Sequence, residues 1–357
     1  MKTSDLLDLY SDYLISSFGP VTATGLSTLL AGEVSHDQVT RALGGTPRTS
    51  ADVWRVSKPF VRQIQRAEGV LILDDSIAHK PYSDENDIVC WHYDHSTGQL
   101  VKGINFLTSL YYCQEVALPV GFVLIAKTEQ YVDKKDGKPK RRSPISKNEY
   151  YRQLAQQAVD NQIPFQYVLN DVWYASAENM RFVKQDLHKD FVMPVKTNRK
   201  VALTVAEQQQ RQFVRVDTLT LEPNRTYTVY LEDVEFPLLL VKQVFAHEDG
   251  SQGILYLVTS ETTLTYDGIT TLYRTRWPVE PYHKSLKQNA SLEKSPTHTV
   301  VTQTNHFFAA LCSYIKLELL KVNLKTNHFA LKTKLYTQAV QAAFKALREL
   351  QPMSLSA

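Results

Sequence analysis

The chain has 357 residues and a formal net charge of +3 at pH 7. This length suits about two or three domains with a substantial core, and the near-neutral charge excludes a uniformly basic nucleic-acid binder, so any such surface requires local clusters of cations. No apolar run reaches the roughly 18 residues that span a bilayer, and the first residues lack the apolar segment of a signal peptide, which predicts a cytoplasmic protein without membrane association.

The first part of the chain is typical of packed helices. Apolar residues recur at helical spacing, and Ser35 is a suitable N-cap for one of these helices. The helices are expected at residues 4–18, 24–33, 35–43 and 52–66. The second and third of them are compatible with a helix-turn-helix, whose second helix would present Gln38 and Arg41 to DNA. A small helical bundle without groove contact is the alternative.

A predominantly β-type region follows, with helical crossovers. Residues 69–73 form a short, fully apolar run that suits a central strand covered on both faces, and it ends at the pair Asp74-Asp75. A helix after Ser146 leads to a strand that can lie parallel beside the first and is followed by Asp171, so we expect the carboxylates of Asp75 and Asp171 to face each other. The strands are expected at residues 70–73, 104–113, 116–126, 165–170 and 190–196.

A cationic run interrupts this region between residues 134 and 142, where Gly and Pro also occur. We interpret it as a solvated loop or as a loop that contacts the DNA backbone through Lys140, Arg141 and Arg142. From about residue 201 to 266, β-forming runs replace the helical crossovers and predict an all-β insertion. Helices are expected again at residues 305–321 and 331–350.

The segment 273–287 places one carboxylate among cations and hydrogen-bond donors. Successive steps of three, four and seven residues return to one face of a helix, so these side chains are able to converge on one ligand. A carboxylate in such company indicates a metal ion beside a phosphate. The polar residues of the segment are Tyr273, Arg276, Glu280, His283, Lys284 and Lys287.

The spacing of Tyr273, Arg276, Glu280 and Lys287 resembles the YREK signature of IS4-type DDE transposases, in which the Glu is the third metal-binding carboxylate. All four positions match. The resemblance implies two upstream aspartates, each after a buried strand. Asp75-Ser76 resembles the Asp-Thr of the first DDE motif, so Asp75 is assigned as the first ligand with Asp74 as the alternative, and Asp171 is the second.

The resemblance implies an α/β fold whose catalytic core is RNase H-like (retroviral integrase-like), with a mixed five-stranded sheet and flanking helices. It also implies a β-rich insertion before the helix that bears Glu280. The expected organisation is an N-terminal helical domain at 1–66, a core in two parts at 67–200 and 267–325, the insertion at 201–266 and a C-terminal helix at 326–357.

The implied activity is metal-dependent phosphodiester hydrolysis and strand transfer at the terminal inverted repeats of an insertion sequence. Asp75, Asp171 and Glu280 would hold two divalent ions, Mg²⁺ with Mn²⁺ as a substitute, because hard ions prefer oxygen ligands. The implied partners are double-stranded DNA, at the transposon ends and at the target, and a second copy of the chain in the DNA complex. No small-molecule cofactor is expected, and the setting would be the nucleoid of a prokaryote.

The other residues of the segment would contact DNA. Arg276, Lys284 and Lys287 would neutralise phosphate, while Tyr273 and His283 could donate hydrogen bonds. The alternative for the cations is ordinary salt bridges. In the best-known members of the family an aromatic residue at the position of Trp277 holds a flipped base; stacking and burial are both open for this side chain.

Two further alternatives stay open. A transposon-derived DNA-binding protein without catalysis, or an RNase H-type nuclease that does not join strands, would share these motifs.

Pro278 and Pro281 bracket Glu280, and Pro281 disfavours helical geometry at Glu280. The helix would then begin at Pro281 with Glu280 as its N-cap, and Tyr273 and Arg276 would lie in the preceding turn.

Overall fold

The computed structural model describes residues 3–94, 97–134, 137–246 and 250–350. The chain forms two compact units, each built from distant parts of the sequence. Unit 1 comprises Met1–Thr49, Ala78–Gly103 and Tyr282–Ala357, and unit 2 comprises Ser50–Ile77 and Ile104–Pro281. The expected domain boundary at residue 66 differs from this division because α4 (Ser50–Ile64) packs on β4 (Val116–Leu124) within unit 2.

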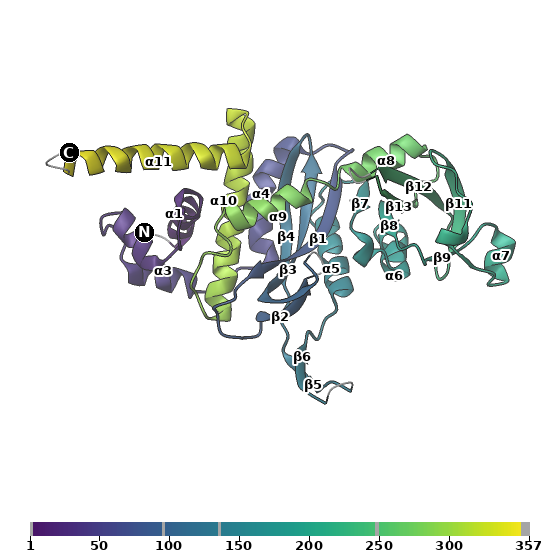
Figure 1. Cartoon of the computed structure of the whole chain (residues 1–357), viewed down its shortest axis with the longest axis horizontal. Helices are drawn as coiled ribbons and strands as arrows, with labels where there is room; N and C mark the ends of the chain where they lie inside the picture. The colour runs from purple at the N-terminus through teal and green to yellow at the C-terminus, as the bar shows by residue number, and fades with distance from the viewer. Residues whose placement is uncertain (1–2, 95–96, 135–136, 247–249, 351–357) are drawn as a thin grey trace. The chain divides into compact units, whose positions relative to one another are not determined.

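Unit 1 is mainly helical (Figure 1), and the successive residues from Asn305 to Leu311 in α10 (Val300–Leu324) are all buried. Ser313 on α10 donates a hydrogen bond from Oγ to the carbonyl of Ser11 at 2.9 Å, which ties α10 to the first helix. The unit also contains the short strand β2 (Val89–Asp94). Its other helices are α1 (Thr3–Ser16), α2 (Ala23–Leu29), α3 (His36–Leu43), α11 (His328–Leu350) and most of α9 (Val279–Gln288). No helix in the described ranges is long and apolar enough to cross a membrane.

The two short helices α2 and α3 confirm the helical prediction for this region and pack on each other. Ser35 and Gln38 form a reciprocal capping box at the start of α3: Ser35 Oγ accepts from the Gln38 N–H, and Gln38 Oε1 accepts from the Ser35 N–H at 2.8 Å. Arg41 is exposed, with its Nε 3.3 Å from the carbonyl of Asp37. A contact of α2 and α3 with a DNA groove stays a prediction. The Gln38 side chain is already hydrogen-bonded in the capping box of α3.

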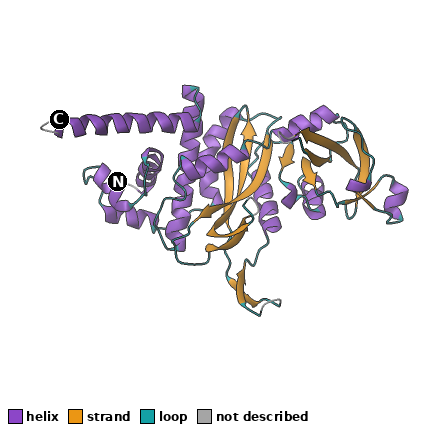
Figure 2. Ribbon diagram, viewed as in Figure 1, coloured by secondary structure: helices purple, strands orange, loops and turns teal. Residues whose placement is uncertain are grey.

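Unit 2 is built on a mixed sheet, seen as the orange arrows of Figure 2. The strand order is β10-β9-β11-β12-β13-β8-β7-β1-β3, and β4 also pairs with β3. The strands at its centre are β1 (Val70–His79), β3 (Gln99–Cys113), β7 (Tyr167–Leu169) and β8 (Asp190–Val195). β1 and β7 are parallel, with Val70 opposite Tyr167 and Ile72 opposite Leu169, and β7 is parallel to β8. The crossover to β7 runs through α5 (Lys147–Asp160), which packs on β4.

All five strands predicted for the core are present, and so is the hairpin of β3 and β4. Its turn is made by Gln114 and Glu115, whose φ angles of 51° and 62° lie in the left-handed region. Two successive left-handed residues match the twist of the adjoining strands, as in a type I′ turn. The parallel placement of β1 and β7, expected from the helical crossover, is therefore also confirmed.

The prediction of a five-stranded sheet with a separate all-β insertion is wrong in two respects. First, β13 (Gln252–Thr259) pairs antiparallel with β8, so the inserted strands continue the core sheet. Second, the insertion contains the helix α7 (Val205–Gln209), which Thr204 and Glu207 stabilise with a capping box. The remaining inserted strands are β9 (Lys200–Ala202), β10 (Val214–Arg215), β11 (Thr226–Leu231) and β12 (Leu238–Ala246).

The cationic run is also more ordered than the predicted loop. β5 (Glu129–Val132) and β6 (Pro139–Arg142) pair antiparallel in a two-stranded ribbon that is separate from the large sheet (Figure 2). Arg142 Nε lies 3.0 Å from Glu129, and Lys140 forms an ion pair with Asp133. These cross-strand charge pairs favour the ribbon. Lys135 lies outside the described residues.

Candidate active site

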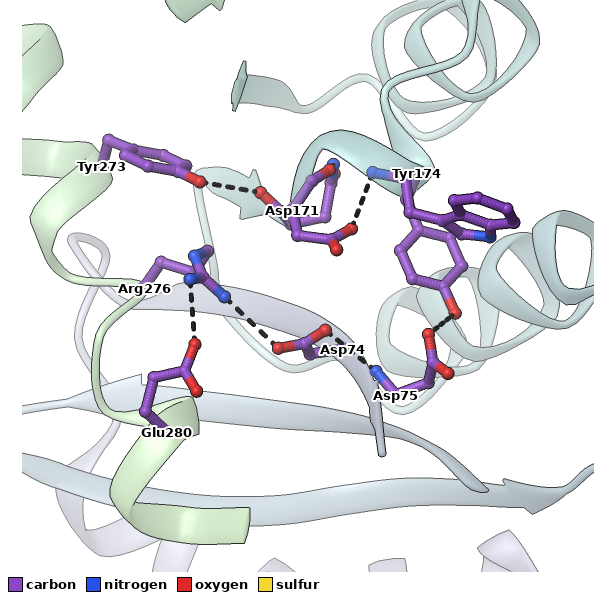
Figure 3. Close-up of polar contacts among 9 residues, drawn as sticks. Asp74, Asp75, Asp171, Tyr174, Tyr273, Arg276 and Glu280 are labelled. Carbon is purple, nitrogen blue, oxygen red and sulfur yellow. Dashed lines mark hydrogen bonds and ion pairs between the residues drawn. The ribbon is translucent and has the colours of Figure 1, made fainter. Parts of the chain in front are cut away.

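Asp74 and Asp75, the two candidates for the first carboxylate of the site, lie within β1 and not after its end. β1 continues to His79, whereas its partner β7 stops at Leu169. Successive side chains of a strand point to opposite faces. Asp74 and Asp75 therefore diverge, and Figure 3 shows Asp74 directed towards Arg276 and Asp75 towards Tyr174.

Asp75 is held by three side chains. Its Oδ2 accepts from Lys147 Nζ at 2.6 Å and from Asn105 Nδ2 at 3.1 Å, and its Oδ1 accepts from the hydroxyl of Tyr174 at 2.7 Å. Burial alone would raise the pKa of Asp75, but the Lys147 ammonium and these hydrogen bonds outweigh it and lower the pKa. Asp75 is thus a well-satisfied carboxylate.

Asp74 has the opposite character. Its Oδ1 accepts from the backbone N–H of Asp75 at 3.0 Å, and its Oδ2 lies 3.3 Å from Arg276 NH1. Burial, followed by the negative charge of Asp171, raises the pKa of Asp74 well above its usual value, although the Arg276 guanidinium opposes this. The ionised form of Asp74 is therefore under-compensated in the protein alone.

Asp171 follows β7 directly and caps the short 3₁₀ helix η1 (Val172–Tyr174). Its Oδ1 accepts from the backbone N–H of Trp173 at 2.9 Å. Burial and then the charge of Asp75 raise the pKa of Asp171, and the capping bond and Arg276 act against this rise. The expected position of Asp171, at the end of a strand beside β1, is confirmed.

Arg276 joins Asp74 to Glu280. Its NH2 lies 3.1 Å from Glu280 Oε1 while NH1 contacts Asp74 (Figure 3). The Arg276 side chain is 16% exposed and that of Glu280 is 47% exposed, so this pair is open to solvent on the Glu280 side. Burial opposes the charge of Arg276, but its neighbours Tyr273, Asp74 and Glu280 outweigh it and raise the pKa.

Tyr273 packs against the same guanidinium, whose carbon is 5.8 Å from the centre of the phenol ring. Its hydroxyl donates a long hydrogen bond of 3.5 Å to the carbonyl of Asn170, at the end of β7. Burial raises the pKa of Tyr273 to about 12. The tyrosine therefore remains a hydrogen-bond donor at neutral pH.

The single helix first inferred for residues 273–287 is wrong. Tyr273 belongs to α8 (Tyr266–Arg274), and Arg276 lies in a turn before α9. The separation of these two residues from the helix of Glu280 is confirmed, but α9 begins at Val279, two residues before Pro281. Glu280 is consequently in the first turn, where a carboxylate is favourable to the helix dipole.

The other predicted contact residues have different surroundings. Trp277 is 67% exposed, so the alternative of a buried tryptophan is wrong. Within unit 1, His283 is buried on α9, whereas Lys284 is exposed and Lys287 is half-buried. Lys284 Nζ lies 5.2 Å from the centre of the Phe329 ring. A contact between DNA and His283 would therefore require its exposure.

Sequence reasoning missed Lys147, Asn105 and Tyr174, which hold Asp75. Lys147 is the first residue of α5, and only the N-cap Ser146 was evident in the sequence. Tyr174 lies three residues after Asp171, a position that the single turn of η1 directs towards β1. No spacing rule links these residues to Asp75, because they come from three different elements.

The carboxylates do not form a closed metal site in this arrangement: the described ranges contain no group of three or more His, Cys, Asp or Glu side chains placed to hold an ion. Arg276 supplies the positive charge between Asp74 and Glu280 instead. Comparison with known families identifies the family of the chain. Residues 3–213 match the family described as DDE superfamily endonuclease. The chain belongs to this DDE superfamily.

Residues 144–316 also match the family described as Transposase DDE domain. No curated protein matches the chain. The two matches overlap across Asp171, and together they include the elements that carry Asp74, Asp75 and Glu280. The DDE families support a nuclease-type enzyme with a transposase-type function and a DNA substrate, and enzymes of this superfamily generally use divalent metal ions.

Proposed function

We propose that this DDE protein is an IS4-type transposase with an RNase H-like core, which hydrolyses a phosphodiester at the terminal inverted repeats of an insertion sequence and joins the ends to target DNA. The observation that supports this most is the convergence of Asp74, Asp171 and Glu280 on the neighbourhood of Arg276 (Figure 3). The strand order β8-β7-β1-β3-β4 supports the RNase H-like assignment.

We propose Asp74 as the first catalytic carboxylate, in preference to Asp75. Asp74 shares Arg276 with Glu280, whereas Asp75 is engaged by Lys147, Asn105 and Tyr174. A metal ligand needs lone pairs that a cation can reach, and an ammonium at 2.6 Å competes directly for those of Asp75. Asp75 then has a positioning role, since it fixes the strand on which Asp74 lies.

The residues fit divalent ions by their chemistry. Asp74, Asp171 and Glu280 offer only oxygen ligands, which Mg²⁺ and Mn²⁺ prefer. The raised pKa values of Asp74 and Asp171 reflect burial and repulsion between carboxylates, both of which a nearby cation relieves. When bound, two such ions activate the attacking oxygen and stabilise the leaving oxygen.

Arg276 would change partners when such ions are present. In the protein alone its guanidinium contacts Asp74 and Glu280. With cations held by Asp74 and Glu280, the Arg276 guanidinium would be free to turn towards the DNA phosphate and to neutralise its charge during the attack. Tyr273, still protonated, positions the guanidinium through its ring contact.

Two copies of the chain are proposed to act together on DNA through α11, which leads away from α10 in Figure 1. Its exposed apolar stripe advances by alternating steps of four and three residues, the pattern of a two-helix seam. Leu347→Glu is expected to convert a DNA complex with two protein copies into one with a single copy, as measured by light scattering, while Gln341→Glu should not. The stripe consists of Tyr336, Val340, Ala343, Leu347 and Leu350.

The decisive test of function uses the DNA that flanks the gene. Purified protein and Mg²⁺ are expected to cut a duplex that carries the terminal inverted repeat and then to insert the cut end into a plasmid. Cutting without insertion products would identify a nuclease, and specific binding without cutting would identify an inactive DNA-binding protein. A scrambled repeat serves as the matched control substrate.

A further inference from the structure

Asn170 is a buried polar residue that follows β7 and directly precedes Asp171. Its exposure is 0%, and a polar side chain so deeply buried costs free energy unless its hydrogen bonds are made. The chain leaves the sheet at this point and turns into η1. The partners of Asn170 therefore decide how the turn that carries Asp171 is held.

The amide of Asn170 is hydrogen-bonded on both sides. Its Nδ2 donates to the backbone carbonyl of Asp171 at 2.7 Å, and its Oδ1 accepts from the hydroxyl of Tyr151 at 2.9 Å. The reverse orientation of the amide would place Oδ1 against the Asp171 carbonyl, where two acceptors repel each other. The carbonyl thus fixes the orientation of the amide, and the hydroxyl of Tyr151 satisfies the other side.

Tyr151 lies on α5 and is itself buried. Burial and then the charge of Asp171 raise the pKa of Tyr151, so that its hydroxyl remains a donor. The ring stacks on that of Tyr174, with 5.3 Å between the ring centres and 13° between the ring planes. Packing against Tyr174 therefore holds the hydroxyl that Asn170 needs.

Asp171 is constrained at its main chain and at its side chain. Asn170 holds the carbonyl, while Oδ1 accepts from the Trp173 N–H at 2.9 Å. The backbone carbonyl of Asn170 also accepts the long hydrogen bond from Tyr273, whose ring packs on Arg276. Asn170 thus contacts both the residue that bears the carboxylate and the tyrosine beside the guanidinium.

We propose that Asn170 is a positioning residue, which holds the Asp171 carboxylate in the orientation that a divalent cation requires, and that Tyr151 holds Asn170 in turn. Groups that fix the ligands of a metal from outside commonly contribute about 10- to 100-fold in metal affinity or activity. Neither residue is proposed as a ligand. This role rests on the proposed function in one respect, namely that Asp171 binds the cation.

The test measures Mn²⁺ binding without DNA, by the electron paramagnetic resonance signal of free Mn²⁺. Asn170→Ala is expected to weaken binding by about tenfold or more. Tyr151→Phe removes one hydroxyl and keeps the ring stack, so it is expected to weaken binding by about fivefold, the equivalent of one ordinary hydrogen bond. Because Tyr151 acts through Asn170, the double variant should bind no more weakly than Asn170→Ala alone.

Tyr111→Phe is the matched control, because it removes another buried hydroxyl of unit 2, which is hydrogen-bonded to the carbonyl of Arg66. Tyr151→Phe and Tyr111→Phe should both melt a few degrees lower than the wild type. Only Tyr151→Phe should also lose Mn²⁺ affinity, which separates positioning from a merely structural role. If Asn170→Ala does not fold, this pair of variants decides alone.

Unchanged Mn²⁺ affinity in Tyr151→Phe would overturn the proposal, as would losses that add in the double variant. Asp171→Asn distinguishes this failure from that of the proposed function. Weakened binding in Asp171→Asn with unchanged binding in Asn170→Ala would overturn the positioning role alone. Unchanged binding in Asp171→Asn, or a wild type that binds no Mn²⁺, would overturn the metal site of the proposed function and the positioning role with it.

Discussion

Asp74→Asn, Asp171→Asn and Glu280→Gln are each expected to reduce Mg²⁺-dependent cutting of inverted-repeat DNA by at least about 10³-fold. Metal ions contribute several kcal/mol of transition-state stabilisation, and each 1.36 kcal/mol corresponds to about tenfold in rate. An amide keeps the size of each side chain but removes the negative charge that holds the cations. The measurement is single-turnover cutting, with binding of the same DNA followed separately and expected to persist.

Asp75→Asn is an informative comparison, because it changes a neighbouring carboxylate whose pKa is lowered, whereas the pKa of Asp74 is raised. The folded pKa of Asp75 is lowered, so its charge stabilises the fold above its unfolded pKa, and this contribution disappears as the pH falls through the folded value. The substitution should therefore lower stability at pH 7 by about 2 kcal/mol, the scale of a hydrogen bond to a charged group. A melting temperature lower by a few degrees would report it.

The same reasoning gives the reverse sign for Asp74. Its folded pKa is raised, so the ionised form disfavours folding at neutral pH and protonation at lower pH relieves this. Asp74→Asn is thus expected to melt higher than the wild type while it loses activity. If Asp75→Asn abolishes cutting and Asp74→Asn cuts normally, the motif-based assignment of Asp75 is right and Asp74 leaves the site.

The sequence was sufficient to predict the strands that position the aspartates, because each of these strands contains an apolar run followed by a polar residue. Val70 to Leu73 and the strand before Asp171 were recognisable, and their parallel pairing followed from the helix between them. The choice between Asp74 and Asp75 was different. It depends on which face of β1 meets Arg276, and the likeness of Asp75-Ser76 to an Asp-Thr motif carries no information about faces.

The inserted strands illustrate a second limit. Their β character was evident in the sequence, but the pairing of β13 with β8 joins segments about 60 residues apart and depends on tertiary packing. The ribbon of β5 and β6 was hidden for another reason. The many cations of this segment indicate a solvated loop, but in the structure Arg142 and Lys140 form ion pairs with Glu129 and Asp133 across the ribbon. Local composition does not reveal partners of this kind.

Arg276→Gln is expected to separate metal affinity from catalysis. The guanidinium now contacts both Asp74 and Glu280, so its removal frees these carboxylates and takes away a positive charge that repels a cation. Mn²⁺ should bind about tenfold more tightly, a gain of about 1.4 kcal/mol, as measured by the electron paramagnetic resonance signal of free Mn²⁺. Cutting should nevertheless fall by about 10²-fold or more, because a donor that stabilises charge in the transition state is lost.

Arg274→Gln provides the matched control for this pair of effects. Arg274 is an exposed arginine in the last turn of α8, two positions from Arg276, so its replacement changes the net charge equally. Neither Mn²⁺ affinity nor cutting should change appreciably. Unaltered Mn²⁺ binding in Arg276→Gln would mean that the guanidinium does not compete with the ions. Tighter Mn²⁺ binding with undiminished cutting would mean that Arg276 only competes with the ions for the carboxylates and never contacts the phosphate. A rise in Mn²⁺ affinity together with a fall in cutting requires that Arg276 contacts the carboxylates first and the DNA phosphate afterwards.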